Sequence, residues 1–162
     1  MRPTFPALLA ALALVCAAAF AAAQDKPADH SQDTAWMNAQ MAALASRQAK
    51  DGWGWLPGGV LWRRVAGDGT GRRPTVDDTV TVHYAGTLVD GTEFDSSYGG
   101  DPVSFPLRGL IRAWQEAIPQ AGVGDTIEIA VPSDLGYGPK GAGPIPGGAT
   151  LLFKIELLGI ES

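Results

Sequence analysis

The chain has 162 residues, enough for one domain with a hydrophobic core and some additional sequence at an end. Its formal net charge is −5, and no basic run is longer than the pairs Arg63-Arg64 and Arg72-Arg73. Nucleic acid is therefore not expected as a partner. The single cysteine, Cys16, has no second cysteine to pair with, which excludes a disulfide-rich scaffold.

Residues 1–23 have the pattern of a secretory signal peptide. Arg2 precedes a run rich in Ala, Leu and Val, and the run ends in three alanines before Gln24. This pattern predicts cleavage after Ala23 and a periplasmic or secreted protein. A membrane anchor is less favoured, because the run is rich in Ala and a spanning helix needs about 20 strongly apolar residues. Lipid attachment at Cys16 is a further alternative, although Val15 precedes it where a small residue is expected.

Residues 24–58 are predicted to contain a linker and one amphipathic helix. Residues 24–33 are polar and without periodicity, whereas 34–50 are rich in helix formers, with Thr34 as the expected N-cap. The apolar side of this helix is too narrow to form a core of its own. It either packs on the domain that follows, pairs with its counterpart in a homodimer, or holds an extended client. Residues 51–59, DGWGWLPGG, break the helix and mark the domain boundary.

Residues 59–162 are predicted to form a compact antiparallel β domain, because short alternating runs recur between Gly- and Pro-rich turns. Strands are expected over residues 60–65, 80–88, 92–94, 103–105, 127–131 and 150–160. Asp90-Gly91 is typical of a hairpin turn. One helix is expected over residues 108–117, and it must lie on the concave side of the sheet because nothing else could cover its apolar face.

Phe94 and Asp95 stand side by side where the hairpin returns. An acid beside an apolar side chain is an arrangement that binds a polar group of a ligand. Taken alone, this short stretch slightly favours Phe94 as ordinary core and Asp95 as a turn former bonding its own backbone. Further residues are needed to choose between these interpretations.

Four separated motifs together resemble the FKBP-type peptidyl-prolyl isomerases. They are VTVHYAGTLVDGTEFDSS, FPLRGLIRAWQEAI, VPSDLGYG and IPGGATLLFKIELL, in this order and spacing within about residues 60–160. The resemblance implies an α+β fold, in which a curled antiparallel sheet of five or six strands surrounds one short helix. In this chain an N-terminal helical extension would precede that domain.

The resemblance also implies a shallow apolar pocket. Its residues would be Trp114 as the floor; Tyr84, Phe94, Val103 and Phe153 as walls; Leu110, Ile111 and Ile145 as the rim; and Asp95, the Tyr137 hydroxyl and the Ile111 backbone N–H as polar groups. The chain departs from the family in three places. Val103 replaces a common aromatic residue, Ala113 replaces a common Gly, and Gly147-Gly148 follow Pro146 where a second Pro is frequent. These changes affect substrate preference and inhibitor affinity more than activity.

The activity implied is rotation of Xaa-Pro bonds, assisting the folding of exported proteins. An apolar pocket that strips water from the amide favours the twisted form, so no cofactor, metal or nucleophile is needed. The partners implied are proline-containing polypeptides and a macrolide inhibitor. His30 and His83 lack partners at ligand spacing, which argues against a metal site.

Two alternatives from other classes remain open. One is a non-catalytic peptide-binding or chaperone module that uses the same pocket. The other is a structural β domain in which every aromatic residue is core, since each of these side chains taken singly is more often core than site. The joint agreement of the motifs favours catalysis.

Overall fold

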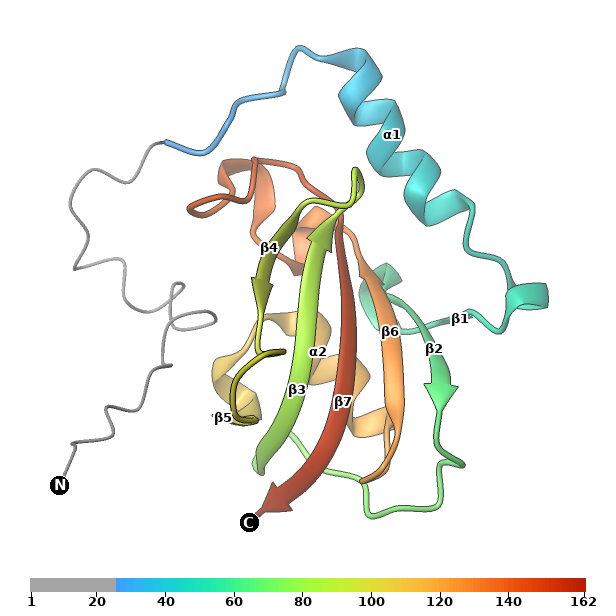
Figure 1. Ribbon diagram of the computed structural model, residues 1–162. Helices are drawn as coiled ribbons and strands as arrows, with labels where there is room; N and C mark the ends of the chain where they lie inside the picture. Colours follow the sequence, from blue (N-terminus) through green and yellow to red (C-terminus); the bar gives the residue numbers. More distant parts are fainter. Residues whose placement is uncertain (1–25) are drawn as a thin grey trace, which may run out of the picture.

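The computed structural model describes residues 26–162, so the predicted signal segment lies outside the described residues (Figure 1). The described chain forms one seven-stranded antiparallel sheet in the order β1-β2-β6-β7-β3-β4, with β5 also paired to β3. The strands are β1 (Gly54–Trp55), β2 (Leu61–Ala66), β3 (Thr79–Leu88), β4 (Glu93–Ser96), β5 (Val103–Pro106), β6 (Thr126–Val131) and β7 (Leu151–Glu161). The helix α2 (Arg112–Ala117) lies behind the sheet in Figure 1. The predicted α+β class is confirmed, and the two-residue β1 is the strand that the sequence did not indicate.

The two central strands carry the alternating pattern from which they were predicted. β3 and β7 pair from Thr79↔Glu161 to Leu88↔Leu151. Along each strand every second side chain is buried, and the buried set contains Val80, Val82, Tyr84, Leu151, Phe153, Ile155 and Leu157. Period-two alternation places these residues on one face, which therefore forms the core wall opposite α2.

The inner helix is shorter than predicted. Residues Leu107–Gly109 form a separate 3₁₀ turn, and the backbone at Leu110 and Ile111 is extended before α2 begins. The Gln115 side chain donates to the Leu110 carbonyl oxygen at 2.8 Å, which holds this extended segment against the helix. The expectation of a continuous helix over 108–117 was wrong because apolar spacing does not reveal such a break. The Ile111 N–H consequently lies outside the helical hydrogen bonds.

The N-terminal helix α1 spans Thr34–Ala45 and crosses one end of the sheet (Figure 1). Its N-cap is Asp33, whose Oδ1 accepts from the Trp36 N–H at 2.9 Å, and not Thr34 as predicted. A carboxylate one residue earlier reaches the same backbone donors. Trp36 packs against the main core and Gln40 is buried, so α1 packs on the domain that follows. No helix within residues 26–162 is long and apolar enough to cross a membrane.

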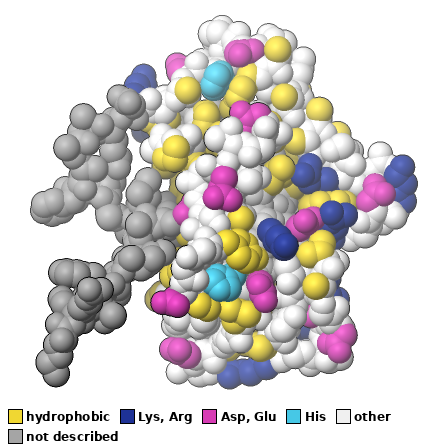
Figure 2. All heavy atoms as spheres, in the orientation of Figure 1, with side chains coloured by type: hydrophobic (Ala, Val, Ile, Leu, Met, Phe, Trp, Pro, Cys, Tyr) yellow, Lys and Arg dark blue, Asp and Glu magenta, His cyan; other side chains and the backbone are white. Residues whose placement is uncertain are grey.

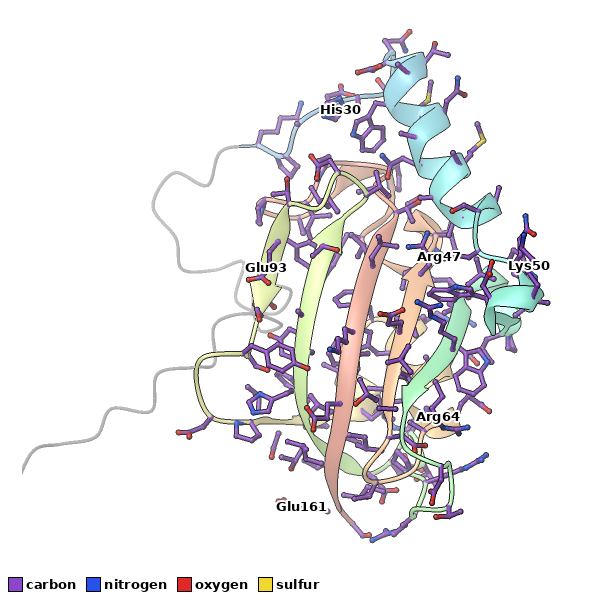
Figure 3. All side chains as sticks on the ribbon, turned by 45° about the vertical axis from the view of Figure 1, so that its right-hand side comes forward. His30, Arg47, Lys50, Arg64, Glu93 and Glu161 are labelled. Carbon is purple, nitrogen blue, oxygen red and sulfur yellow. The ribbon has the colours of Figure 1, made fainter. Side chains whose placement is uncertain are left out.

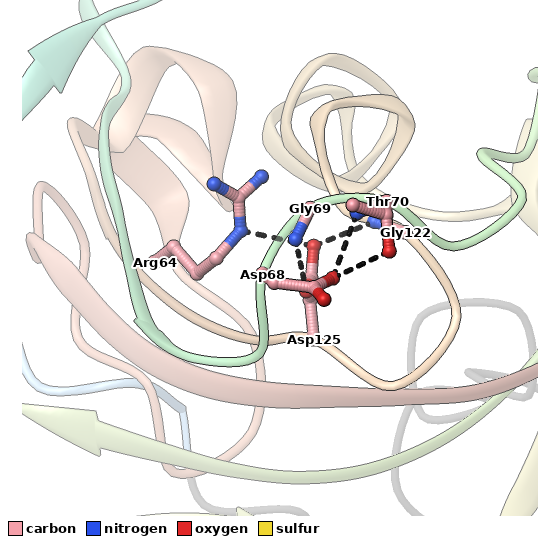
Figure 4. Close-up of polar contacts among 6 residues, drawn as sticks. All are labelled: Arg64, Asp68, Gly69, Thr70, Gly122 and Asp125. Carbon is pink, nitrogen blue, oxygen red and sulfur yellow. Dashed lines mark hydrogen bonds and ion pairs between the residues drawn. The ribbon is translucent and has the colours of Figure 1, made fainter.

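A polar cluster around Asp125 joins β2, the loop after it and the start of β6 (Figure 4). The Asp125 carboxylate accepts from the Gly122 N–H at 2.9 Å, the Gly69 N–H at 3.0 Å and Arg64 Nε at 2.9 Å. Gly67 approaches this carboxylate so closely that a Cβ there would lie 2.1 Å from Asp125 Oδ1. We call Arg64, Gly69, Gly122 and Asp125 the Asp125 cluster.

The outward face of the sheet carries charges of both signs. Figure 2 shows Lys and Arg side chains interspersed with Asp and Glu on the face turned away from α2. One such pair is Arg63 Nη2 with Glu128 Oε2 at 2.7 Å, between β2 and β6. This surface presents no extended region of one sign in that view.

Candidate functional site

Five aromatic side chains meet on the concave side of the sheet. Trp114, from α2, is fully buried, and its ring lies edge-to-face with Tyr84 at 5.3 Å, Phe153 at 5.4 Å and Phe105 at 6.4 Å between ring centroids. Phe94 lies edge-to-face on Phe153 at 5.6 Å. We call these five residues the aromatic cluster. Edge-to-face packing from β3, β4, β5, β7 and α2 holds the rings in fixed orientations.

Gly86 makes room for this packing. A Cβ at Gly86 would lie 2.6 Å from Phe94 Cζ and 2.8 Å from Phe153 Cε1. Any larger residue at position 86 would therefore displace both rings. A glycine inside a strand is a known sign of such a close approach, but the pattern does not tell which side chains approach.

Tyr84 and Asp95 form the polar part of the site. The Tyr84 hydroxyl donates to Asp95 Oδ2 at 2.8 Å across the β3–β4 pair. The backbone of Tyr84 is held by Ser97, whose Oγ accepts from the Tyr84 N–H at 2.8 Å and whose N–H donates to the Tyr84 carbonyl oxygen at 2.9 Å. The acid is thus fixed beside the aromatic walls.

Burial sets the ionisation of these groups. It raises the pKa of Asp95, although the hydrogen bond from Tyr84 acts in the opposite direction. It also raises the pKa of Tyr84, an effect strengthened by Asp95, so the tyrosine stays protonated and donates. Burial first and the negative charge of Asp95 second raise the pKa of Tyr137 to about 12. Both hydroxyls are therefore neutral donors at physiological pH.

Two further groups border the aromatic cluster. Within residues 26–162 the Ile111 N–H donates to no protein group, while its carbonyl oxygen accepts from Trp114 and Gln115 at the start of α2. Ile145 is buried in a tight loop in which Ala142 and Ile145 pair through hydrogen bonds of 3.0 and 2.9 Å. Tyr137 begins the same loop, half-buried against the core. The site is thus bordered by backbone segments outside the sheet.

The structure brings most of the predicted site residues together. Tyr84, Phe94, Trp114 and Phe153 are in the aromatic cluster, and Asp95 is bonded to it. Leu110, Ile111, Ile145 and Tyr137 pack around the same core. Val103 is half-buried and pairs with Val82 of β3.

Sequence reasoning missed Phe105. Its ring lies 6.1 Å from that of Tyr84 and borders Trp114. The signal was present, because period-two alternation in β5 places Phe105 on the same face as Val103.

A curled antiparallel sheet over one short helix, with an aromatic cluster beside a hydrogen-bonded acid, defines an FKBP-like domain. The family model described as FKBP-type peptidyl-prolyl cis-trans isomerase matches residues 70–158. The chain therefore belongs to the FKBP-type peptidyl-prolyl cis-trans isomerase family.

Individual relatives agree. The chain is 44% identical over 119 residues to the FKBP-type isomerase FkpA of Aeromonas hydrophila, covering 73% of this chain and 44% of the relative. It is 43% identical over 122 residues to the outer membrane protein MIP of Legionella longbeachae, covering 74% and 52%. The chain thus spans about half the length of the curated relatives it matches.

Solved structures give the same picture. A peptidyl-prolyl cis-trans isomerase from Pseudomonas syringae superposes with a TM-score of 0.73 at 32% identity, covering 85% of this chain and all of that one. FkpA of Escherichia coli superposes with a TM-score of 0.72 at 36% identity, covering 82% of this chain and 61% of that one. Both superpositions extend over more of the chain than the residues that the family model matches.

Proposed function

We propose that this protein is a peptidyl-prolyl cis–trans isomerase that accelerates rotation of Xaa-Pro bonds in exported polypeptides during folding. The observation that carries the proposal is the aromatic cluster with Trp114 at its centre and the Tyr84–Asp95 hydrogen bond at its side. Membership of the isomerase family supports the same reaction.

The pocket lowers the rotational barrier by favouring a twisted amide. Rotation about a peptide bond meets a barrier of roughly 18–20 kcal/mol because the nitrogen lone pair is shared with the carbonyl. Xaa-Pro bonds populate both isomers but exchange over tens to hundreds of seconds, roughly, without a catalyst. In the twisted amide conjugation is lost and the carbonyl is less polar, so removing water stabilises it relative to the planar form. No covalent step is required.

Each group has a role in this proposal. Trp114 is the floor under the proline ring, and Phe94, Tyr84 and Phe153 with Val103 are its walls. Leu110 and Ile145 contact the residues on either side. The Ile111 N–H and the Tyr137 hydroxyl donate to the carbonyl oxygens of the substrate chain and hold it in one orientation. Asp95 fixes the Tyr84 ring and complements the polarised amide.

We propose the following organisation for the rest of the chain: residues 1–23 as a cleaved signal peptide, 24–58 as linker and helix, and 59–162 as the isomerase domain. A periplasmic or secreted location and a chaperone-like role in folding follow from this. The same apolar pocket makes a macrolide inhibitor a candidate ligand. A homodimer through α1 is supported by two exposed methionines, Met37 at 38% and Met41 at 62% exposure.

Exchange of a short Xaa-Pro peptide, measured by NMR with the purified protein, tests the activity. We expect exchange far faster than the uncatalysed rate, and its loss in a Phe94→Ala, Asp95→Ala double variant that remains folded. Both side chains are only half-buried, so the variant should fold. The matched control replaces an exposed aromatic residue and an exposed acid, Trp55→Ala with Asp101→Ala. No acceleration by the unaltered protein, with several residues tried before proline, would favour a non-catalytic binding module.

Replacing the pocket floor or one wall separates catalysis from a purely structural role. Trp114→Leu and Phe153→Leu remove an aromatic surface from the proposed proline site while keeping an apolar side chain. Unchanged exchange in either folded variant would show that the pocket is assigned to the wrong residues.

A further inference from the structure

Helix α1 reaches the border of the site through one buried polar residue. Gln40 is 7% exposed, whereas most of its helix faces solvent. Its side-chain Oε1 accepts from the Thr150 N–H at 2.9 Å, and its backbone carbonyl oxygen accepts from the Thr150 hydroxyl at 3.4 Å. Among the described residues, these are the hydrogen bonds that join α1 to the isomerase domain.

Thr150 lies between strand β7 and the loop that runs from Tyr137 to Gly148. It directly precedes β7, which carries Phe153. On its other side the Gly148 N–H donates to the Gly138 carbonyl oxygen at 2.9 Å, next to Tyr137. The Ala149 N–H donates to the Pro146 carbonyl oxygen at 3.3 Å, next to Ile145. The segment that ends at Thr150 is therefore hydrogen-bonded to the loop beside both residues that border the aromatic cluster.

The packing of α1 around Gln40 leaves space on both sides. A cavity of about 470 Å³ lies between α1 and the loops, lined among others by Trp36, Met41, Pro139 and Gly147. A second cavity of about 180 Å³ lies between Gln40, Ala149 and the β3–β4 turn. Between these spaces Trp36 and Leu44 pack against core residues, and the middle of the helix is joined to the domain by hydrogen bonds. The Gln40–Thr150 hydrogen bonds add a directional link to this packing.

Aromatic contacts support α1 on either side of this link. The edge of the Trp36 ring lies against Gly148, 3.7 Å from where a Cβ would be. His30 stacks on Trp36 at 4.6 Å, and Arg47 lies over Trp53 at 5.1 Å. Figure 3 shows His30 and Arg47 near opposite ends of the helix. The helix is held at its ends by rings and in its middle by Gln40.

We propose that Gln40 is a positioning residue of the isomerase site. Through Thr150 it fixes the loop from Tyr137 to Gly148, so that α1 contributes to substrate affinity without touching the substrate. This inference rests on the proposed function, because the loop affects turnover only if Tyr137 and Ile145 contact the peptide.

The test compares three variants of the whole purified protein. Gln40→Met has similar length but no acceptor, Gln40→Glu keeps an acceptor oxygen, and Gln48→Met makes the same change at an exposed glutamine. We expect Gln40→Met to raise KM for an Xaa-Pro peptide about fivefold, the size of one lost hydrogen bond, with kcat within about twofold. Gln40→Glu keeps the acceptor for the Thr150 N–H but loses the Nε2 donation to the Trp36 carbonyl oxygen and buries a charge, so it should recover only part of this loss. Gln48→Met should have no effect. Urea unfolding verifies that each variant is folded.

Two readouts separate positioning from a general loss of stability. The amide NMR signals of Tyr137 and Ile145 should shift in Gln40→Met and not in Gln48→Met. In a double-mutant cycle with Tyr137→Phe, the two losses should be less than additive, since both act through the same loop.

Unshifted loop amides, or additive losses, would overturn the inference. If the unaltered protein does not accelerate exchange, the proposed function fails, and the amide signals alone decide whether Gln40 positions the loop.

Discussion

Asp95 and Asp125 are acids removed from bulk water in the same domain, but their surroundings differ. Asp125 is 1% exposed, and its carboxylate accepts from two backbone N–H groups and an arginine. Burial acts to raise its pKa, yet these donors outweigh burial and lower it. Asp95 is half-buried and has the Tyr84 hydroxyl as its side-chain donor, and burial raises its pKa.

This difference indicates that Asp125 stabilises the fold, whereas Asp95 is available to interact with a ligand. Both carboxylate oxygens of Asp125 accept hydrogen bonds from groups of the protein, so this side chain stabilises the fold. The aromatic cluster leaves one polar atom without a partner, because among the described residues the buried Trp114 indole N–H has no acceptor. Such an omission costs about 1–3 kcal/mol and is typical of functional sites.

The largest expected effect on stability is that of Asp125→Ala. It leaves the N–H groups of Gly69 and Gly122 and the Arg64 guanidinium without their partner, and should lower the free energy of unfolding by about 3 kcal/mol. Urea denaturation measures this loss. Asp68→Ala, which removes an exposed acid from the same loop, is the control and should change stability far less. Unchanged stability in Asp125→Ala would remove the cluster from its structural role.

Gly86→Ala should damage the site more than any change of similar size elsewhere. The added methyl group displaces Phe94 and Phe153, costing about 1–3 kcal/mol of stability and roughly tenfold or more in kcat/KM. Peptide exchange and urea unfolding measure the two losses. Gly109→Ala is the matched control, because no atom lies within 4 Å of its Cβ position. Equal activity of both variants would mean that the exact position of the rings is unimportant.

The two acids should respond to pH in opposite directions when each is replaced by Asn. The pKa of Asp125 is lowered on folding, so its contribution is present above the unfolded value of about 3.9 and is lost as pH falls through the folded value. The pKa of Asp95 is raised on folding, so as pH rises the unfolded chain releases its proton first. The wild type therefore loses stability relative to Asp95→Asn as pH rises from the unfolded pKa to the folded pKa of this group.

Urea unfolding between pH 3 and pH 7 measures both differences. The Asp95 effect should be the smaller, because that side chain is less buried. Slopes of the same sign for the two variants would contradict the contrast between the acids.

The smallest effect is expected at Val103, the proposed wall residue that stands where an aromatic residue is common in the family. Val103→Phe adds an aromatic ring on the face of β5 that carries Phe105, and should lower KM for an Xaa-Pro peptide about threefold. Ser104→Phe is the register control, because Ser104 is exposed and bonds to the Thr81 hydroxyl on the other face. If both variants behave alike, Val103 does not border the proline site.

Patterns local in sequence predicted much of this molecule. Alternation located β3 and β7, and Asp90-Gly91 located the hairpin, where Gly91 has a φ of 89°. Trp114 was placed on the inner helix from spacing, and the order of the motifs indicated the family. Two local details were wrongly predicted: Asp33 and not the adjacent Thr34 caps α1, and residues 110–111 lie outside α2.

The amino-acid sequence by itself determined the longer strands and the hairpin, because period-two and turn preferences act between near neighbours. Only the tertiary structure decided that Gly86 admits two rings, that Phe105 completes the aromatic cluster, and that Gln40 bonds Thr150 across 110 residues. These features are contacts between segments far apart in the sequence. Local sequence patterns do not reveal them, because the segments meet only when the sheet has curled and α1 has packed on it.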